Sequence, residues 1–179
     1  MMHSIIFAGF GGQGVMLMGQ VLAQAGMSEN KYVTWFPSYG PEMRGGTANC
    51  TVVVSEEPVA SPVVEMPTEV VAMNIPSLLK FEPKVQKNGC LFINISVVDR
   101  KPQRSDIRVY EIPANDIAER IGNLKVANMV MLGSFVQVTK CVSIDSLIEA
   151  MKYKLSARSS EIIDLNTKAI FEGAKHVGG

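Results

Sequence analysis

The chain has 179 residues, of which 47% are hydrophobic and 19% are charged, so it is long and apolar enough to form one globular domain with a substantial core. Its 17 basic residues equal its 17 acidic residues, and this balance argues against a nucleic-acid-binding surface. No apolar run approaches the roughly 20 residues that a bilayer-spanning helix needs, and the N-terminus lacks the pattern of a signal peptide. We therefore expect a single domain over residues 1–179, located in the cytoplasm, that binds neither nucleic acid nor membrane.

Hydrophobic periodicity predicts alternating strands and helices in the first two-thirds of the chain and helices from residue 114 onward. The expected strands or extended segments are 5–8, 31–36, 48–55, 59–62, 69–74, 90–95 and 108–112. The expected helices are 14–28, 77–81, 115–121 and 127–140, one helix capped by Ser143, and a last helix that begins at Ser159 or Ser160. This order predicts an α/β fold, which we expect to be a three-layer α/β/α domain with a mostly parallel or mixed central sheet and a helical C-terminal third.

A cluster of glycines follows the first strand directly and precedes the first helix. Gly9, Gly11 and Gly14 have G-x-G-x-x-G spacing, and Gly12 and Gln13 lie between them. Such a turn has no Cβ atoms and leads into a helix N-terminus with free N–H groups and a partial positive charge. The turn could therefore bind a phosphate group. Alternatively, the glycines could serve only for close packing of the strand against the helix.

The details around this turn argue against the usual nucleotide-binding motifs. A dinucleotide site requires an acidic residue at the end of the second strand, but segment 31–36 is followed by Pro37, and the nearest acid, Glu29, precedes that strand. A triphosphate-binding loop requires Lys and Ser or Thr after the last glycine, where Val15 and Met16 stand. A Rossmann-like nucleotide-dependent oxidoreductase and a stand-alone binding module remain the alternative functions.

The histidines and cysteines of the chain do not form a recognisable catalytic or metal-binding motif. His3 and His176 lie near opposite ends of the chain, and we expect both to be exposed and without an acidic or nucleophilic partner. Cys50, Cys90 and Cys141 are widely spaced, which is typical of a reduced compartment and does not match a zinc or iron–sulfur motif. Cys50 lies in an apolar strand and is expected to be buried and unreactive. The sequence therefore predicts no catalytic residue and no metal ligand on this chain.

The loop after the second strand supplies the remaining candidate contacts. Arg44 is suited to bind a phosphate or a partner's carboxylate with its fork of N–H groups, or it pairs internally with Glu42. Tyr39 is either a contact residue or a loop-packing residue, and Asn49 lies beside the loop and contacts a ligand or only caps the loop. Because the glycine turn and the loop both follow strands, we expect them on one edge of the sheet, beyond the strand C-termini. The candidate contacts to a ligand or a partner chain are Tyr39, Glu42, Arg44, Gly45, Gly46 and Asn49.

Two motifs together are more specific than the glycine spacing alone. They are Gly9-Phe-Gly-Gly-Gln-Gly-Val15 and Pro37-Ser-Tyr-Gly-Pro-Glu-Met-Arg-Gly-Gly46. The chain resembles, over essentially its whole length, the gamma subunit of 2-oxoacid:ferredoxin oxidoreductases, and it is most similar to the 2-oxoglutarate type. The Ser61-Pro62 step and the segment Asn128-Met-Val-Met-Leu-Gly133 are similar to that family as well.

The resemblance implies a non-catalytic subunit of a complex that makes acyl-CoA, CO2 and reduced ferredoxin from a 2-oxoacid and coenzyme A. In that family the alpha and beta subunits hold thiamine diphosphate and Mg, and [4Fe-4S] clusters lie in the beta and small delta subunits. The gamma chain packs on the thiamine-binding subunits near the place where coenzyme A approaches, and by itself is expected to be inactive. The resemblance thus implies that the turn, with Gly9, Gly11, Gly12, Gln13 and Gly14, binds a coenzyme A phosphate or a partner's carboxylate.

Overall fold

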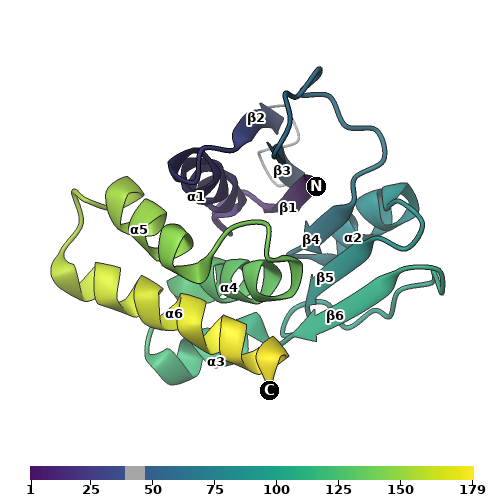
Figure 1. The fold of residues 1–179 in the computed structure, drawn as a ribbon. Coiled ribbons are helices and arrows are strands. Elements are labelled where there is room, and N and C mark those ends of the chain that lie inside the picture. The colour runs from purple at the N-terminus through teal and green to yellow at the C-terminus, as the bar shows by residue number, and fades with distance from the viewer. Residues whose placement is uncertain (39–46) are drawn as a thin grey trace.

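The computed structural model describes residues 1–38 and 47–179 (Figure 1), and within these residues six strands form one sheet in the order β2-β3-β1-β4-β5-β6. The strands are β1 (Met2–Phe10), β2 (Tyr32–Ser38), β3 (Thr47–Ser55), β4 (Glu69–Ala72), β5 (Cys90–Asn94) and β6 (Arg108–Ile112). The α-helices are α1 (Val15–Ser28), α2 (Ile75–Phe81), α3 (Ala114–Ile121), α4 (Ala127–Thr139), α5 (Ile144–Lys154) and α6 (Ser160–Gly178). Short 3-10 helices are η2 (Glu82–Lys84) and η3 (Leu124–Val126).

The sheet is mixed, as the sequence predicts. Strands β1, β4, β5 and β6 are parallel to one another, whereas β3 is antiparallel to both β1 and β2. The helix that follows β1 leads to β2, but β3 lies between these two strands in the sheet. A dinucleotide-binding unit would pair β2 directly with β1, so the strand order differs from that of the Rossmann-like alternative.

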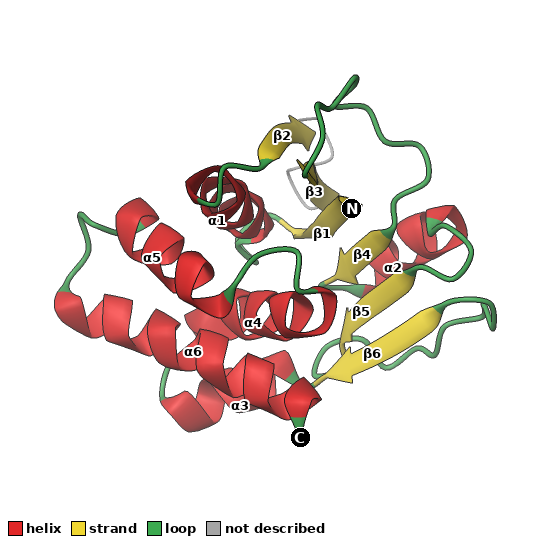
Figure 2. Ribbon diagram, viewed as in Figure 1, coloured by secondary structure: helices red, strands yellow, loops and turns green. Residues whose placement is uncertain are grey.

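The two faces of the sheet are covered unequally (Figure 2). Helices α1, α3, α4, α5 and α6 pack on one face, and α2 packs on the opposite face. Alternation along β1 directs Ile5 and Phe7 to the larger helical layer and Ile6 to the α2 side. Phe7 and Phe92 contact the ring of Phe135 edge-on, with centroid distances of 5.7 and 5.3 Å. The main core therefore lies between the sheet and α4.

Most element boundaries agree with the sequence analysis to within two residues. The expected strand 69–74 ends at Ala72 because the side chain of Asn74 caps α2 by accepting a hydrogen bond of 2.8 Å from the Ser77 N–H. Segment 59–62, expected to be extended, forms no strand. The second strand continues through Pro37, which is compatible with β2 being an edge strand. Among the described residues, no helix is long and apolar enough to cross a membrane.

Helices α4 and α6 cross at a contact in which each provides a glycine. A β-carbon at Gly133 would overlap the backbone of Ile170, and a β-carbon at Gly173 would overlap the backbone of Val130. The buried hydroxyl of Ser134 has one hydrogen to donate, and its Oγ lies 2.8 Å from the Gly173 carbonyl oxygen and 3.1 Å from that of Val130. The two backbones therefore approach as closely as backbone atoms allow, and this contact fixes the position of α6 on the domain.

We expect Gly173→Ala to lower the free energy of unfolding by about 3 kcal/mol or more, because the obstructing atoms are backbone atoms that cannot rotate away. Urea denaturation followed by circular dichroism measures the change. Lys175→Ala, at an exposed position of the same helix, serves as the control and is expected to change stability by less than about 0.5 kcal/mol. Equal stability of the two variants would contradict the close crossing.

Candidate functional site

A crevice forms between the C-terminal ends of the parallel neighbours β1 and β4, because the helices that follow these two strands lie on opposite faces of the sheet. The chain leaves β1 into α1 on the larger helical layer, and it leaves β4 into α2 on the other face. Ligands of open α/β sheets bind at such switch points, beyond the C-terminal ends of the strands. A cavity of about 240 Å³ occupies this position, and we call it the switch cavity. Its lining consists of Gly12, Gln13, Met73, Asn115, Leu124, Lys125, Ala127 and Asn128.

The side chain of Gln13 connects the glycine turn to the neighbouring strand. Its Oε1 accepts a hydrogen bond of 2.7 Å from the Phe10 N–H, and its Nε2 donates to the Met73 carbonyl at 3.0 Å. The amide group has two N–H bonds, and this network uses one of them. Gln13 therefore braces the turn, a function that sequence reasoning missed, and it still lines the cavity as a potential donor.

The glycines of the turn divide into two kinds. A β-carbon at Gly9 would lie 2.7 Å from Gln13 Oε1 and 2.9 Å from Met73 Cβ, and one at Gly14 would overlap the side chain of Asn128. Gly9 and Gly14 are thus required for close packing, which was one of the two interpretations of the sequence. Gly12 is exposed and has a φ of +91°, and a β-carbon added there would have no neighbouring atom within 4 Å. Its conformation favours glycine, while its backbone is accessible to a ligand.

Buried asparagines hold the far walls of the switch cavity. Asn94, fully buried at the end of β5, donates to Asn115 Oδ1 at 2.8 Å and accepts from the Ala114 N–H at 3.1 Å. Asn128 donates to the Gly14 carbonyl at 3.3 Å and accepts from the Met129 N–H at 2.9 Å. Sequence reasoning named Asn128 only as part of the segment similar to the family, and it assigned no site function to either Asn94 or Asn128. The position of Asn94 at the end of a buried parallel strand is the one signal that could have indicated it.

The charges around the switch cavity favour an anion. Helix α1 begins at Val15 after the N-cap Gly14, its first turn contains no acidic residue, and no side chain among the described residues accepts a hydrogen bond from the N–H groups of that turn. Among the described residues that line the cavity, Lys125 is the one with a charge, and it is exposed. The Asn123 side chain caps η3 by accepting from the Lys125 N–H at 3.0 Å, which fixes the backbone from which the ammonium extends. Sequence reasoning missed Lys125.

Of the six candidate contacts in and beside the second loop, Asn49 falls within the described residues. Tyr39, Glu42, Arg44, Gly45 and Gly46 lie outside them. The ends of the loop are placed by the sheet register, in which Phe10 pairs with Thr47 and Ser38 with Asn49, so β1 and β2 end on the same edge as expected. Asn49, however, lines a second cavity on the α2 face of the sheet, and it is absent from the lining of the switch cavity.

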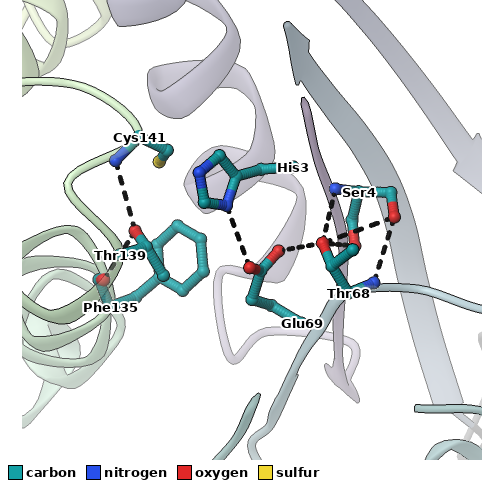
Figure 3. Close-up of polar contacts among 7 residues, drawn as sticks. All are labelled: His3, Ser4, Thr68, Glu69, Phe135, Thr139 and Cys141. Atoms are coloured by element: carbon teal, nitrogen blue, oxygen red, sulfur yellow. Dashed lines mark hydrogen bonds and ion pairs between the residues drawn. The ribbon is translucent and has the colours of Figure 1, made fainter. Parts of the chain in front are cut away.

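The expectation that His3 is exposed and unpartnered is wrong (Figure 3). His3 is half-buried in β1, and its Nδ1 lies 2.9 Å from Oε1 of the buried Glu69. Thr68 donates to the same carboxylate and, through its Oγ1, accepts from the Ser4 N–H at 2.8 Å. Strand β1 begins earlier than expected, at Met2, and pairs with β4, which brings these distant residues together. The group lies at the starts of β1 and β4, on the edge opposite the switch cavity, and ties the two strands together.

The remaining potentially reactive side chains lie away from the switch cavity. His176 is exposed as expected, with its Nε2 3.3 Å from the Glu111 carbonyl. Cys50, Cys90 and Cys141 are buried, and burial raises the pKa of the Cys50 thiol to about 12 and that of Cys141 to about 11. Within residues 1–38 and 47–179, no group of three or more His, Cys, Asp or Glu side chains is arranged to hold a metal ion.

Glu29, the acid nearest to the expected ribose-binding position, has a structural contact instead. It follows α1 and accepts a hydrogen bond of 2.7 Å from the N–H of Ser143, the residue that caps α5, and its other oxygen lies 3.0 Å from Lys31 Nζ. Partial burial raises the pKa of Glu29, but the hydrogen bond from Ser143 and the interaction with Lys31 outweigh it and lower the pKa to about 2. Glu29 therefore joins α1 to α5.

Glu29→Gln should lower the free energy of unfolding near pH 7 by about 1 to 2 kcal/mol, after allowance for solvent screening of this partly exposed group. Because the pKa in the folded state is below the ordinary value of 4.5, the stabilisation is complete above pH 4.5 and is lost as the pH falls toward 2. Urea unfolding of both proteins from pH 7 to pH 2.5 should show a difference that shrinks with acidification. Glu149→Gln, in an exposed pair with Lys152, is the control. A difference independent of pH would contradict the assignment.

Residues 4–176 match the family model described as pyruvate ferredoxin/flavodoxin oxidoreductase. The chain is 34% identical over 186 residues to "2-oxoglutarate synthase subunit KorC" of Methanothermobacter marburgensis, with 98% of this chain and 100% of the relative covered. It is 40% identical over 168 residues to "Ketoisovalerate oxidoreductase subunit VorA" of the same organism, with 93% of this chain covered. The chain spans only 35% of the length of that VorA relative.

Solved structures have the same fold. The crystal structure of the gamma subunit of a keto/oxoacid ferredoxin oxidoreductase from Geobacter sulfurreducens is similar with a TM-score of 0.84 and 27% identity, and 98% of each chain is covered. The 2-oxoglutarate:ferredoxin oxidoreductase from Magnetococcus marinus, solved with 2-oxoglutarate, coenzyme A and succinyl-CoA bound, gives a TM-score of 0.90 at 22% identity. In that protein the similar part is 31% of the chain, whereas 99% of the present chain is covered.

Proposed function

The chain belongs to the pyruvate ferredoxin/flavodoxin oxidoreductase family, and we propose that it is the non-catalytic gamma subunit of a 2-oxoacid:ferredoxin oxidoreductase that helps to bind coenzyme A. The complete enzyme would convert a 2-oxoacid and coenzyme A into acyl-CoA and CO2 and reduce ferredoxin. In this proposal the alpha, beta and delta subunits carry thiamine diphosphate, Mg and the [4Fe-4S] clusters. The present chain contributes shape and hydrogen-bond donors.

The observation that carries this proposal is the switch cavity. Coenzyme A bears several phosphate groups, and the cavity combines the accessible backbone of Gly12, which directly precedes the start of α1, with the ammonium of Lys125. These groups attract a phosphate in the way that helix N-termini and lysines do elsewhere. Among the described residues that line the cavity none has a carboxylate, so none of these residues repels an anion.

The size of the cavity limits what this chain binds alone. At about 240 Å³ it is smaller than the roughly 300–1,000 Å³ of sites that enclose drug-sized ligands. We infer that it accommodates one phosphate-bearing part of coenzyme A while the neighbouring subunits enclose the remainder. The thioester-forming chemistry, which coenzyme A supplies through its thiol, would then take place on the partners.

For the substrate we propose 2-oxoglutarate. The KorC relative, named as a subunit of 2-oxoglutarate synthase, matches this chain over its full length, which supports the proposal. Relatives named for ketoisovalerate and pyruvate also match, and "Pyruvate synthase subunit PorC" of Methanothermobacter thermautotrophicus is 32% identical over 163 residues. Assays of the assembled enzyme with 2-oxoglutarate, pyruvate and 3-methyl-2-oxobutanoate would distinguish these substrates, and preference for either of the other two would refute the assignment.

Lys125→Ala is expected to raise the KM for coenzyme A of the assembled enzyme about 5- to 10-fold, because a charge-assisted contact to phosphate is lost. The kcat at saturating coenzyme A and the KM for the 2-oxoacid should change little. Lys154→Ala, on the exposed side of α5 and outside the lining of the cavity, removes the same charge elsewhere and is the control. An unchanged KM for coenzyme A in Lys125→Ala would contradict phosphate binding at the switch cavity.

Arg44→Ala tests the contact that the sequence predicts in the second loop. We expect the variant to fold normally but to weaken either assembly of the complex or use of coenzyme A, since a fork of donors to an anion would be lost. Sedimentation measures assembly, and the KM for coenzyme A measures its use. If both remain at the wild-type value, Arg44 has only an internal role in the loop.

The isolated chain provides a further test of the proposal as a whole. We expect no turnover of 2-oxoacid by the purified chain alone and full turnover after it is mixed with the other subunits. A ligand that binds the folded state raises the melting temperature. A large rise with NAD or FAD alone would favour the Rossmann-like alternative and refute the assignment as a non-catalytic subunit.

A further inference from the structure

The second cavity, which we call the α2-side cavity, lies on the sheet face opposite the larger helical layer. It has a volume of about 250 Å³, enough for one large side chain, and its lining comes from β1, β2, β3, the segment after β3, α2 and η2. Its lining includes Phe36, Asn49, Thr51, Val63, Phe81 and Lys84. It is separate from the switch cavity, because no described residue lines both.

The apolar side chains around this cavity are unusually accessible. Phe36 is 52% exposed and Val63 is 67% exposed. In the sheet register Phe36 pairs with Thr51, and Thr51 pairs with Ile6, which packs in the core beside α2. Phe36 therefore points to the α2 side of the sheet. The main sheet contacts of α2 are with β1 and β4 and not with β2, the strand that contains Phe36. Large apolar side chains exposed in a group mark a protein interface.

The described residues supply positive charges at the rim. Among the described residues that line the cavity, the charged ones are Lys80 and Lys84. Their ammonium groups lie 5.4 and 5.6 Å from the centroid of the same Phe81 ring, so both are held at one side of the cavity. Because Lys84 is exposed, an occupant with an apolar group for the cavity and a carboxylate beside Lys84 is complementary to this arrangement.

Resting on the proposed function, we propose that the α2-side cavity is the docking site for a catalytic subunit of the same enzyme, which inserts an apolar side chain flanked by an acidic residue. The larger helical layer already covers the other sheet face, whereas this face retains exposed apolar side chains. In two longer relatives the part similar to this protein makes up 35% and 31% of the chain, so there it is one part of a larger polypeptide. Asn49, a candidate partner contact from the sequence, lines this cavity.

The test measures binding of the purified chain to the remaining subunits, prepared as a subcomplex without it, by isothermal titration calorimetry. Phe36→Ser should weaken binding at least 10-fold, because the apolar wall of the cavity is lost. The matched control is Tyr32→Ser, since Tyr32 is 50% exposed on the same strand but lies outside the lining. The control should bind within 2-fold of the wild-type chain. Melting curves establish that both variants are folded.

A second variant does not depend on an aromatic residue of the sheet. Lys84→Glu changes one exposed side chain at the rim and should weaken binding at least 5-fold and reduce its dependence on salt, because a favourable charge pair becomes repulsive. Lys87→Glu, exposed and outside this cavity, is the control. Wild-type affinity in both Phe36→Ser and Lys84→Glu would overturn the docking site while leaving the proposed function intact. Absence of binding by the wild-type chain would overturn both.

Discussion

The switch cavity depends on the tight joint between the glycine turn and its two neighbours. Gln13 connects the turn after β1 to the end of β4, and Gly14 allows Asn128 of α4 to approach the start of α1. A side chain at Gly9 or Gly14 would separate these elements. The joint therefore determines both the direction of α1 and the opening in which the accessible backbone at Gly12 lies. Gly9 and Gly14 allow the close packing and Gly12 leaves its backbone accessible, so the two interpretations of the motif are compatible.

The two faces of the sheet make different contacts, because helices cover one face more fully than the other. On one face, α4 and α6 meet through their glycines and, with the other helices, bury the aromatic core around Phe135. On the other face, α2 leaves apolar side chains exposed on β2 and on the segment after β3. Exposed apolar side chains lower solubility and do not stabilise the isolated fold. Such a surface is therefore expected on a chain that buries it against a partner. The proposed coenzyme A contact and the proposed docking site thus lie at different places on the sheet.

The polar contacts far from the switch cavity hold elements of the fold together. His3 with Glu69 joins the starts of β1 and β4, and Glu29 with Ser143 joins the end of α1 to the start of α5. Each pair connects segments distant in sequence, and each side chain is shielded from water on one side. Buried polar groups need such partners, because an unpaired one would cost free energy of folding. These pairs lie on the sheet edge opposite the switch cavity, which is consistent with a structural function.

The sequence by itself determined the element order, the α/β class and the family resemblance, because hydrophobic periodicity, Asn and Ser caps and the glycine motif are local signals. It also located Gly12 and Gln13, which line the switch cavity. Only the tertiary structure decided that β3 separates β1 from β2, that His3 meets Glu69, and that Lys125 faces the glycine turn across more than a hundred residues of chain. The physical reason is that strand pairing and helix packing bring together residues that are far apart in the sequence. No local pattern in the sequence indicates which of these residues will meet.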